Sequence, residues 1–234
     1  MCFHNAMSAR IRRLAARYGR KTDILEMAQE LIHEQYHVNA FTYPLYPVVT
    51  RDMEIQAMNW GLIPSWVKTI KDAKEIRTKT LNARAETIFE KPSFREPARH
   101  KRCLIPATGF FEWRHEGGEK IPYYIHLKGE EVFSMAGLYD IWRDPESNSY
   151  LVTFTQITTE ANPLLAFIHN SKKRMPAILP KEQEELWLDP DLTTAEAGSL
   201  LLPYEEDRMD AYVVDKNFVR RDPFDPDIIE KLPE

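Results

Sequence analysis

The segment CLIPATGFFEW, residues 103–113, opens the part of the chain that decides the fold. From there to Ile157, aromatic and β-branched residues recur in short runs, a composition typical of β-strands. Gly117 and Gly118 separate the first two runs and predict a hairpin turn. We therefore expect successive strands at 109–113, 121–125, 132–136 and 150–154.

The flanking regions add helices and further strands. Before the strand-rich region, apolar spacing predicts helices at 8–18 and 23–36 and strands at 47–50 and 54–58. After it, the predicted elements are helices at 162–168, 181–188 and 194–202 and strands at 175–179 and 211–214. We expect an α+β fold, a single domain with a mainly antiparallel, barrel-like sheet flanked by helices. The domain is expected to span 1–220, with 221–234 as an extended C-terminal tail.

Composition narrows the class of protein. The 234 residues are 43% hydrophobic, enough for a sizeable core, and carry a net charge of −5. This charge argues against coating nucleic acid by bulk electrostatics but leaves local binding open. We expect an intracellular protein, cytoplasmic and nucleoid-associated in a bacterium, because neither a secretory signal nor a membrane-spanning stretch is visible.

The two cysteines, Cys2 and Cys103, form neither a disulfide framework nor a metal-ligand spacing. No metal and no organic cofactor is expected. Cys103 is predicted to be a buried strand residue. Cys2 follows the initiator methionine, and a small second residue generally allows removal of that methionine. Many proteins with such a start have no N-terminal chemistry, so Cys2 needs support from the rest of the chain.

A free N-terminal cysteine carries an amine and a thiol two carbons apart. It can condense with an aldehyde to an imine and then close through sulfur into a five-membered thiazolidine. The ordinary pKa values are about 7.7–8.0 for the amine and about 8.5 for the thiol, so both groups are available near neutral pH. Cys2 is therefore a candidate reagent for aldehydes.

Two further residues are candidates for proton transfer. Glu112 lies among aromatic neighbours, so burial is expected to raise its pKa, as suits a general acid or base. The alternative is an outward-facing glutamate on an alternating strand. His169 follows an apolar helical run and carries the side chain best suited to proton transfer near neutral pH. On its own it is as well explained as a core or helix-end histidine.

Polar and aromatic residues elsewhere suggest a nucleic-acid groove. Asn82 is a candidate for orienting a nucleophile and Arg84 for binding phosphate, the alternative being that they cap and solvate a helix. Trp60 is assigned to the core, whereas Trp66 beyond Pro64 is a candidate for stacking on an unpaired base. Asn39 is expected in an extended loop that lines the same groove.

Several motifs together resemble one family. They are Cys2 after the initiator methionine, 60–66 (WGLIPSW), 82–87 (NARAET), 103–113, and His169 ahead of 174–176 (RMP). In order and combination they are similar to the SOS-response-associated peptidase (SRAP) family, whose members crosslink to abasic sites in single-stranded DNA. The resemblance spans residues 2 to about 180.

The resemblance implies roles for individual residues. It assigns catalysis to Cys2, Asn82, Glu112 and His169, and DNA binding to Arg84 and Arg174. The implied partner is single-stranded DNA with abasic sites, including single-strand/double-strand junctions, bound covalently by a monomer that removes its own Met1. One departure is Phe3-His4 where family members often have Gly-Arg, so a phosphate contact from an arginine is missing there.

Two other classes of function remain open from sequence. N-terminal-cysteine glutamine amidotransferases also begin with Met-Cys, but they need an oxyanion hole, a glutamine pocket and usually a second synthase domain. A non-covalent binding module for modified bases would use Trp66 and the arginines without requiring Cys2.

Overall fold

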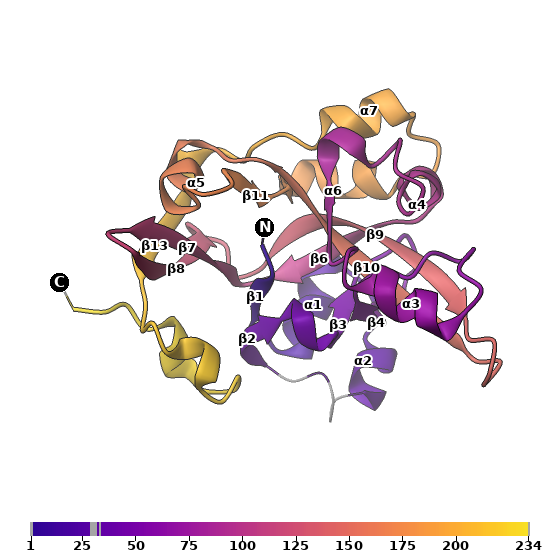
Figure 1. Ribbon diagram of the computed structural model, residues 1–234, viewed down its shortest axis with the longest axis horizontal. Coiled ribbons are helices and arrows are strands. Elements are labelled where there is room, and N and C mark those ends of the chain that lie inside the picture. Colours follow the sequence, from indigo (N-terminus) through magenta and orange to yellow (C-terminus); the bar gives the residue numbers. More distant parts are fainter. Residues whose placement is uncertain (1, 29–31, 33, 234) are drawn as a thin grey trace.

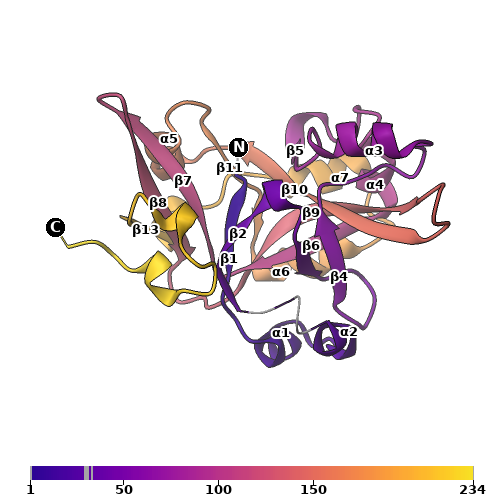
Figure 2. The same ribbon diagram turned by 60° about the horizontal axis from the view of Figure 1, so that its bottom comes forward.

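The computed structural model describes residues 2–28, 32 and 34–233, which fold into two β-sheets with helices around them (Figures 1 and 2). The first sheet has the order β13-β8-β7-β1-β2, and the second has the order β12-β9-β10-β4-β3, with β5 and β11 paired to β10 and β6 paired to β9. The strands are β1 (His4–Met7), β2 (Gln35–Asn39), β3 (Leu45–Val48), β4 (Gln56–Trp60), β5 (Asn82–Arg84), β6 (Arg102–Ala107), β7 (Gly109–Glu116), β8 (Glu119–Leu127), β9 (Phe133–Arg143), β10 (Tyr150–Glu160), β11 (Arg174–Pro176), β12 (Ile178–Leu179) and β13 (Met209–Val213).

Short helices surround the sheets. In Figure 1, α4, α6 and α7 lie above the second sheet, and α5 lies beside the end of the first. The α-helices are α1 (Ile11–Tyr18), α2 (Asp23–Met27), α3 (Ile70–Arg77), α4 (Arg95–His100), α5 (Pro163–Ile168), α6 (Lys181–Leu188) and α7 (Thr194–Ser199). The 3-10 helices are η1 (Ala40–Thr42), η2 (Ala85–Thr87), η3 (Glu206–Arg208), η4 (Phe218–Arg220) and η5 (Pro226–Ile229).

The α+β single-domain expectation is confirmed, but the barrel-like sheet is wrong. A sheet closes into a barrel only when its first and last strands pair with each other. The described strands instead form two sheets with separate edges, β13 and β2 in one, β12 and β3 in the other. The predicted hairpin is confirmed, because Gly117 and Gly118 join β7 to β8 with φ angles of 58° and 86°.

The helix predicted at 23–36 is wrong in its second half. Helix α2 ends at Met27, and residues 35–39 form β2, which pairs with β1. Pairing with β1 therefore overrides the local helical spacing; residues 29–31 and 33 lie outside the described part of the chain. The strand predicted at 175–179 is two short strands, because β11 pairs with β10 and β12 pairs with β9.

Aromatic residues fill the interior of both sheets. Trp60 is fully buried and stacks on Phe154 with ring centroids 5.5 Å apart, as expected for a core tryptophan. Phe111 stacks on Phe218 of η4 at 4.3 Å, and Ile228 of η5 is buried in the same cluster. The segment beyond residue 220, expected to be an extended tail, is thus packed onto the first sheet.

A buried hydrogen bond joins the two sheets. The Asn5 side chain in β1 donates from Nδ2 to Oε1 of Gln156 in β10 at 2.9 Å, and both residues are fully buried. Gln156 also stands in register with Asn82 of the parallel strand β5. The chain that precedes β1 is therefore held beside the strand that begins with Asn82.

Gly109 provides a test of this packing. A Cβ atom at Gly109 would lie 2.3 Å from the ring of Tyr124, whose hydroxyl donates to the carbonyl of Thr108. We predict that Gly109→Ala lowers the free energy of unfolding by about 2–3 kcal/mol, because the ring is buried and must shift. Urea denaturation measures this change.

Gly198 in α7 is the matched control, since its added Cβ would meet only Phe89 at 3.7 Å. Gly198→Ala is expected to leave stability unchanged or to raise it by up to about 1 kcal/mol. Equal effects at Gly109 and Gly198 would contradict the close approach of Tyr124.

Candidate active site

Cys2 is fixed by its neighbours on two strands. It directly precedes the short chain leading into β1, and β1 pairs antiparallel with β7 at Asn5 and Phe110. The carbonyl oxygen of Cys2 accepts a hydrogen bond from Nδ2 of Asn82 at 3.0 Å. Cys2 is fully buried. Asn82 thus contacts the backbone of Cys2, and its role in orienting a nucleophile stays a prediction.

Glu112 points inward from β7. It is 3% exposed, which rules out the alternative of an outward-facing strand residue. Burial raises the pKa of Glu112 to about 7, although hydrogen bonds from Cys2 and from the backbone of Trp113 act in the opposite direction. Near neutral pH this carboxyl group therefore exchanges a proton readily, as a general acid or base must.

His169 follows the last residue of α5 and is buried. Its Nδ1 lies 2.9 Å from the carbonyl oxygen of Arg174 and 3.5 Å from Oε1 of Glu112. Burial is the main reason why its pKa falls to about 4, so the imidazole is neutral at pH 7. The Nδ1 proton is donated to the Arg174 carbonyl, because a carbonyl oxygen only accepts. His169 therefore lies at the end of a helix, as the alternative interpretation expected, and also lies beside Glu112.

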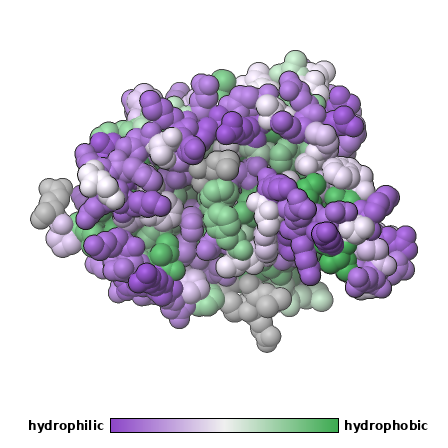
Figure 3. All heavy atoms as spheres, in the orientation of Figure 1, coloured by the Kyte–Doolittle hydropathy of each residue, from purple (hydrophilic) through white to green (hydrophobic). Residues whose placement is uncertain are grey.

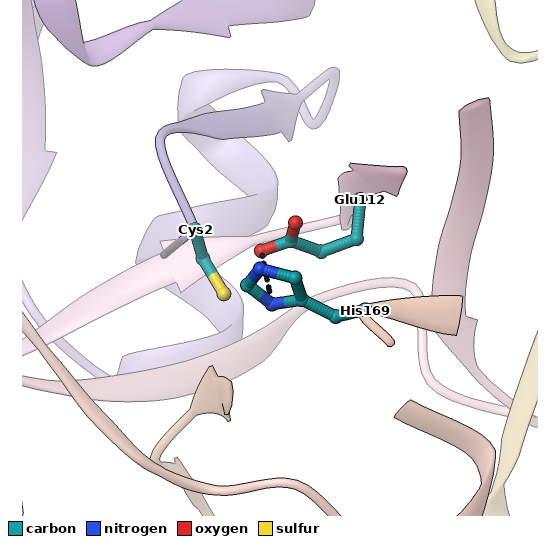
Figure 4. Close-up of side chains that lie close together, drawn as sticks. All are labelled: Cys2, Glu112 and His169. Carbon is teal, nitrogen blue, oxygen red and sulfur yellow. Dashed lines mark ion pairs between the residues drawn. The ribbon is translucent and has the colours of Figure 1, made fainter. Parts of the chain in front are cut away.

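The thiol, the carboxylate and the imidazole converge from three segments that are distant in sequence. One ligand-type atom from each of Cys2, Glu112 and His169 lies within 4.8 Å of the other two. Figure 4 shows all three side chains pointing toward one another. Burial first, and then the charge of Glu112, raises the pKa of the Cys2 thiol, so the thiol is protonated at rest. A reaction at sulfur therefore requires a base, and Glu112 is adjacent.

Arg84 lines a hollow beside the site, and Trp66 contacts another of its lining residues. This hollow has a volume of about 430 Å³ and is lined by Asn82 and Arg84 among others. Trp66 is 51% exposed, and its Nε1 donates to the carbonyl of Pro92, which lines the same hollow.

The helix-capping alternative for Asn82 and Arg84 is wrong, because both belong to β5 and Arg84 makes no capping side-chain hydrogen bond to η2.

Arg174 and Asn39 are engaged within the protein. The Arg174 guanidinium forms two ion-pair contacts with Glu86 and donates to the carbonyl oxygen of Thr158 at 2.6 Å. Only 8% of Arg174 is exposed, so the expectation that it faces DNA phosphate is corrected to an internal role beside His169. Asn39 accepts a hydrogen bond from the Phe41 amide at the start of η1, a local capping role.

Sequence reasoning missed the part that Phe3 and His4 take in the site. Phe3 lines the hollow beside Asn82 and also a second hollow, of about 340 Å³, lined by Glu112 and His169. His4 lines the second hollow and lies 2.8 Å from His37, Nδ1 to Nε2. Burial lowers the pKa of His4 to about 3, so this position adds no positive charge. Their position directly after Cys2 in the sequence is the feature that could have indicated a place in the site.

The face drawn in Figure 3 shows apolar spheres along its middle, bordered by hydrophilic surface. In the described part of the chain, no helix is long and apolar enough to cross a membrane.

Known proteins are similar to this chain in sequence and in fold. The chain is 43% identical over 202 residues to the abasic site processing protein YoqW of Bacillus subtilis, covering 82% of this chain and 87% of that protein. It is 36% identical to the chicken abasic site processing protein HMCES over 70% of this chain and 54% of that protein.

A crystal structure of a protein from Bacteroides thetaiotaomicron superposes with a TM-score of 0.98 at 56% identity, covering 99% of this chain and 100% of that one. The profile of the family described as SOS response associated peptidase matches residues 1–220. The chain therefore belongs to the SOS response associated peptidase (SRAP) family.

Proposed function

We propose that this protein processes abasic sites by crosslinking to them in single-stranded DNA through a thiazolidine formed by Cys2. The observation that carries the proposal is the buried convergence of Cys2, Glu112 and His169 at the N-terminal end of β1. The relatives described as abasic site processing proteins support the choice of substrate. Removal of Met1 would give Cys2 the free amine that the chemistry needs.

The first step joins the amine to the lesion. An abasic deoxyribose exists mainly as a closed hemiacetal, and only its open form carries an aldehyde. The neutral imidazole of His169 accepts the hemiacetal hydroxyl proton and passes it to the ring oxygen as the bond between that oxygen and the hemiacetal carbon breaks, so the ring opens and His169 returns to its neutral form. The Cys2 amine then adds to the aldehyde carbon and forms a carbinolamine. Asn82 holds the Cys2 carbonyl at 3.0 Å and so keeps the amine in line with the incoming carbon.

The second step closes the ring. Protonated Glu112 donates its proton to the carbinolamine hydroxyl, which leaves as water and produces an iminium ion. The Cys2 sulfur attacks the iminium carbon, and its thiol proton passes to the Glu112 carboxylate. Glu112 thereby returns to its starting state, and the net change is loss of one water. A pKa of about 7 allows Glu112 both to donate and to accept this proton.

Ring closure protects the DNA strand. An open imine withdraws electrons and promotes β-elimination, which cleaves the strand. The saturated thiazolidine has no such electron sink, so the product is an intact strand capped by protein. Exposed Arg84 is proposed to bind phosphate and Trp66 to stack on an unpaired base, which favours single strands and junctions over continuous duplex. We propose that a monomer carries out this reaction.

The crosslink itself is the first test. Incubation with an oligonucleotide that contains one abasic site is expected to give an adduct that survives a denaturing gel. Cys2→Ala is expected to abolish the adduct, whereas Cys103→Ala, at the other buried cysteine, retains it. Reversible binding that is insensitive to Cys2→Ala would instead support a non-covalent module, and glutaminase activity would support an amidotransferase.

The pH dependence tests the role of Glu112. Below its pKa of about 7 the carboxyl group is protonated and can donate; above that pH the acid form is lost. The Cys2 amine has the opposite requirement, because it must be neutral and its ordinary pKa is about 7.7–8.0. We predict a bell-shaped dependence of the initial crosslinking rate on pH. Glu112→Gln should lower the rate and remove the fall on the alkaline side.

Self-removal of Met1 is a separate proposal that uses the same groups. If Glu112 takes part in cleavage of the Met1–Cys2 bond, Glu112→Ala should accumulate protein that retains Met1. Intact-mass spectrometry of purified protein measures the retained fraction, with Glu116→Ala at the exposed end of β7 as the control. Complete removal of Met1 in the Glu112 variant would assign processing to another enzyme.

A further inference from the structure

The three buried side chains of the active site are of residue types that can bind a metal ion. Cys2 offers sulfur, His169 nitrogen and Glu112 oxygen, the three donor types that bind Zn²⁺ in proteins. Zn²⁺ ligand bonds of about 2.0–2.3 Å place tetrahedral ligand atoms roughly 3.3–3.7 Å apart. In the structure the three candidate ligand atoms lie within 4.8 Å of one another, which is about 1 Å more than the separation in a metal-bound site. Rotation of the side chains can supply this difference.

The surroundings of two ligands suit a bound cation. Oε1 of Glu112 is buried and has no hydrogen-bond partner among the described residues. Nδ1 of His169 lies 2.9 Å from the Arg174 carbonyl oxygen, so the proton of the neutral ring is on Nδ1 and the lone pair is on Nε2. Metal-binding histidines characteristically donate their other ring N–H to a backbone carbonyl or carboxylate in this way.

Charge balance favours a divalent ion over a monovalent one. A thiolate and a carboxylate contribute two negative charges, and neutral imidazole contributes none. A divalent cation balances the charges of these three side chains, which reduces the cost of burying them away from water. Sulfur and nitrogen ligands select Zn²⁺ and Co²⁺ over Mg²⁺ and Ca²⁺, which prefer oxygen.

We propose that Cys2, Glu112 and His169 bind a thiophilic divalent cation of the Zn²⁺ class, and that the bound ion blocks the reactive cysteine. The ion takes the sulfur lone pair that must attack the lesion and the carboxylate that must accept the thiol proton. Binding releases to solvent the thiol proton and also the carboxyl proton of those molecules in which Glu112 carries one. The ion is thus an inhibitor at this site and takes no part in the reaction; the inhibitory half of the inference rests on the proposed crosslinking function.

Cobalt spectroscopy tests the binding half without DNA. Co²⁺ added to the full-length protein is expected to give a near-ultraviolet thiolate-to-metal absorption band that saturates at one ion per chain and disappears on addition of Zn²⁺. Cys2→Ala should abolish the band, and Glu112→Gln should weaken Co²⁺ binding by roughly tenfold or more. Cys103→Ala is the matched control and should retain the band. Absence of the band, or its persistence in Cys2→Ala, would overturn the inference.

Crosslinking tests the inhibitory half separately. Zn²⁺ at saturation should slow the initial crosslinking rate by about tenfold or more, and a chelator should restore it. An unchanged rate with the site filled would overturn the inhibitory role. A cobalt band without crosslinking under chelator would overturn the proposed function and leave the metal site intact. Crosslinking without a cobalt band would overturn the metal site and leave the proposed function intact.

Discussion

The buried hydrogen bond between Asn5 and Gln156 is the interaction on which the site depends. It is the side-chain link, at 2.9 Å, between β1 of the first sheet and β10 of the second. The first sheet carries Glu112, and the second contains strand β5, which carries Asn82. This link, together with the hydrogen bond from Asn82 to the Cys2 carbonyl, therefore holds Cys2 between both. Removing one partner would leave a buried amide unpaired, at a cost of about 1–3 kcal/mol.

Removal of the site from water sets the protonation states of its three side chains. The same burial raises the pKa of Glu112 toward neutrality, lowers that of His169 and keeps the Cys2 thiol protonated. These three shifts have one direction in common: each favours the uncharged form. A site that is nearly uncharged at rest can accept the polar lesion and develop charge only as the reaction proceeds.

Much of this could be predicted from the sequence, and the exceptions have physical reasons. The strands between residues 109 and 160 and the hairpin at Gly117 follow local patterns, so they were predictable. The division into two sheets depends on pairing between distant strands, which periodicity does not encode. Glu112 and His169 were identified by their apolar neighbours. The family resemblance places Arg174 at the DNA, and its internal ion pair is not foreseeable from local patterns because Glu86 is 88 residues away in sequence.

Strand β10 is a part of the chain in which insertions and deletions of residues are poorly tolerated. Side chains two residues apart on a strand share a face, and Gln156 and Thr158 use that face to bind Asn5 and the Arg174 guanidinium. An insertion or deletion of one residue in β10 just before Gln156 would turn both side chains to the opposite face. The turn at 145–149 before β10 is exposed, and of the residues that the structure describes its side chains form hydrogen bonds only with 143–149, so natural variation in length within this family is expected to accumulate there and not in the strand.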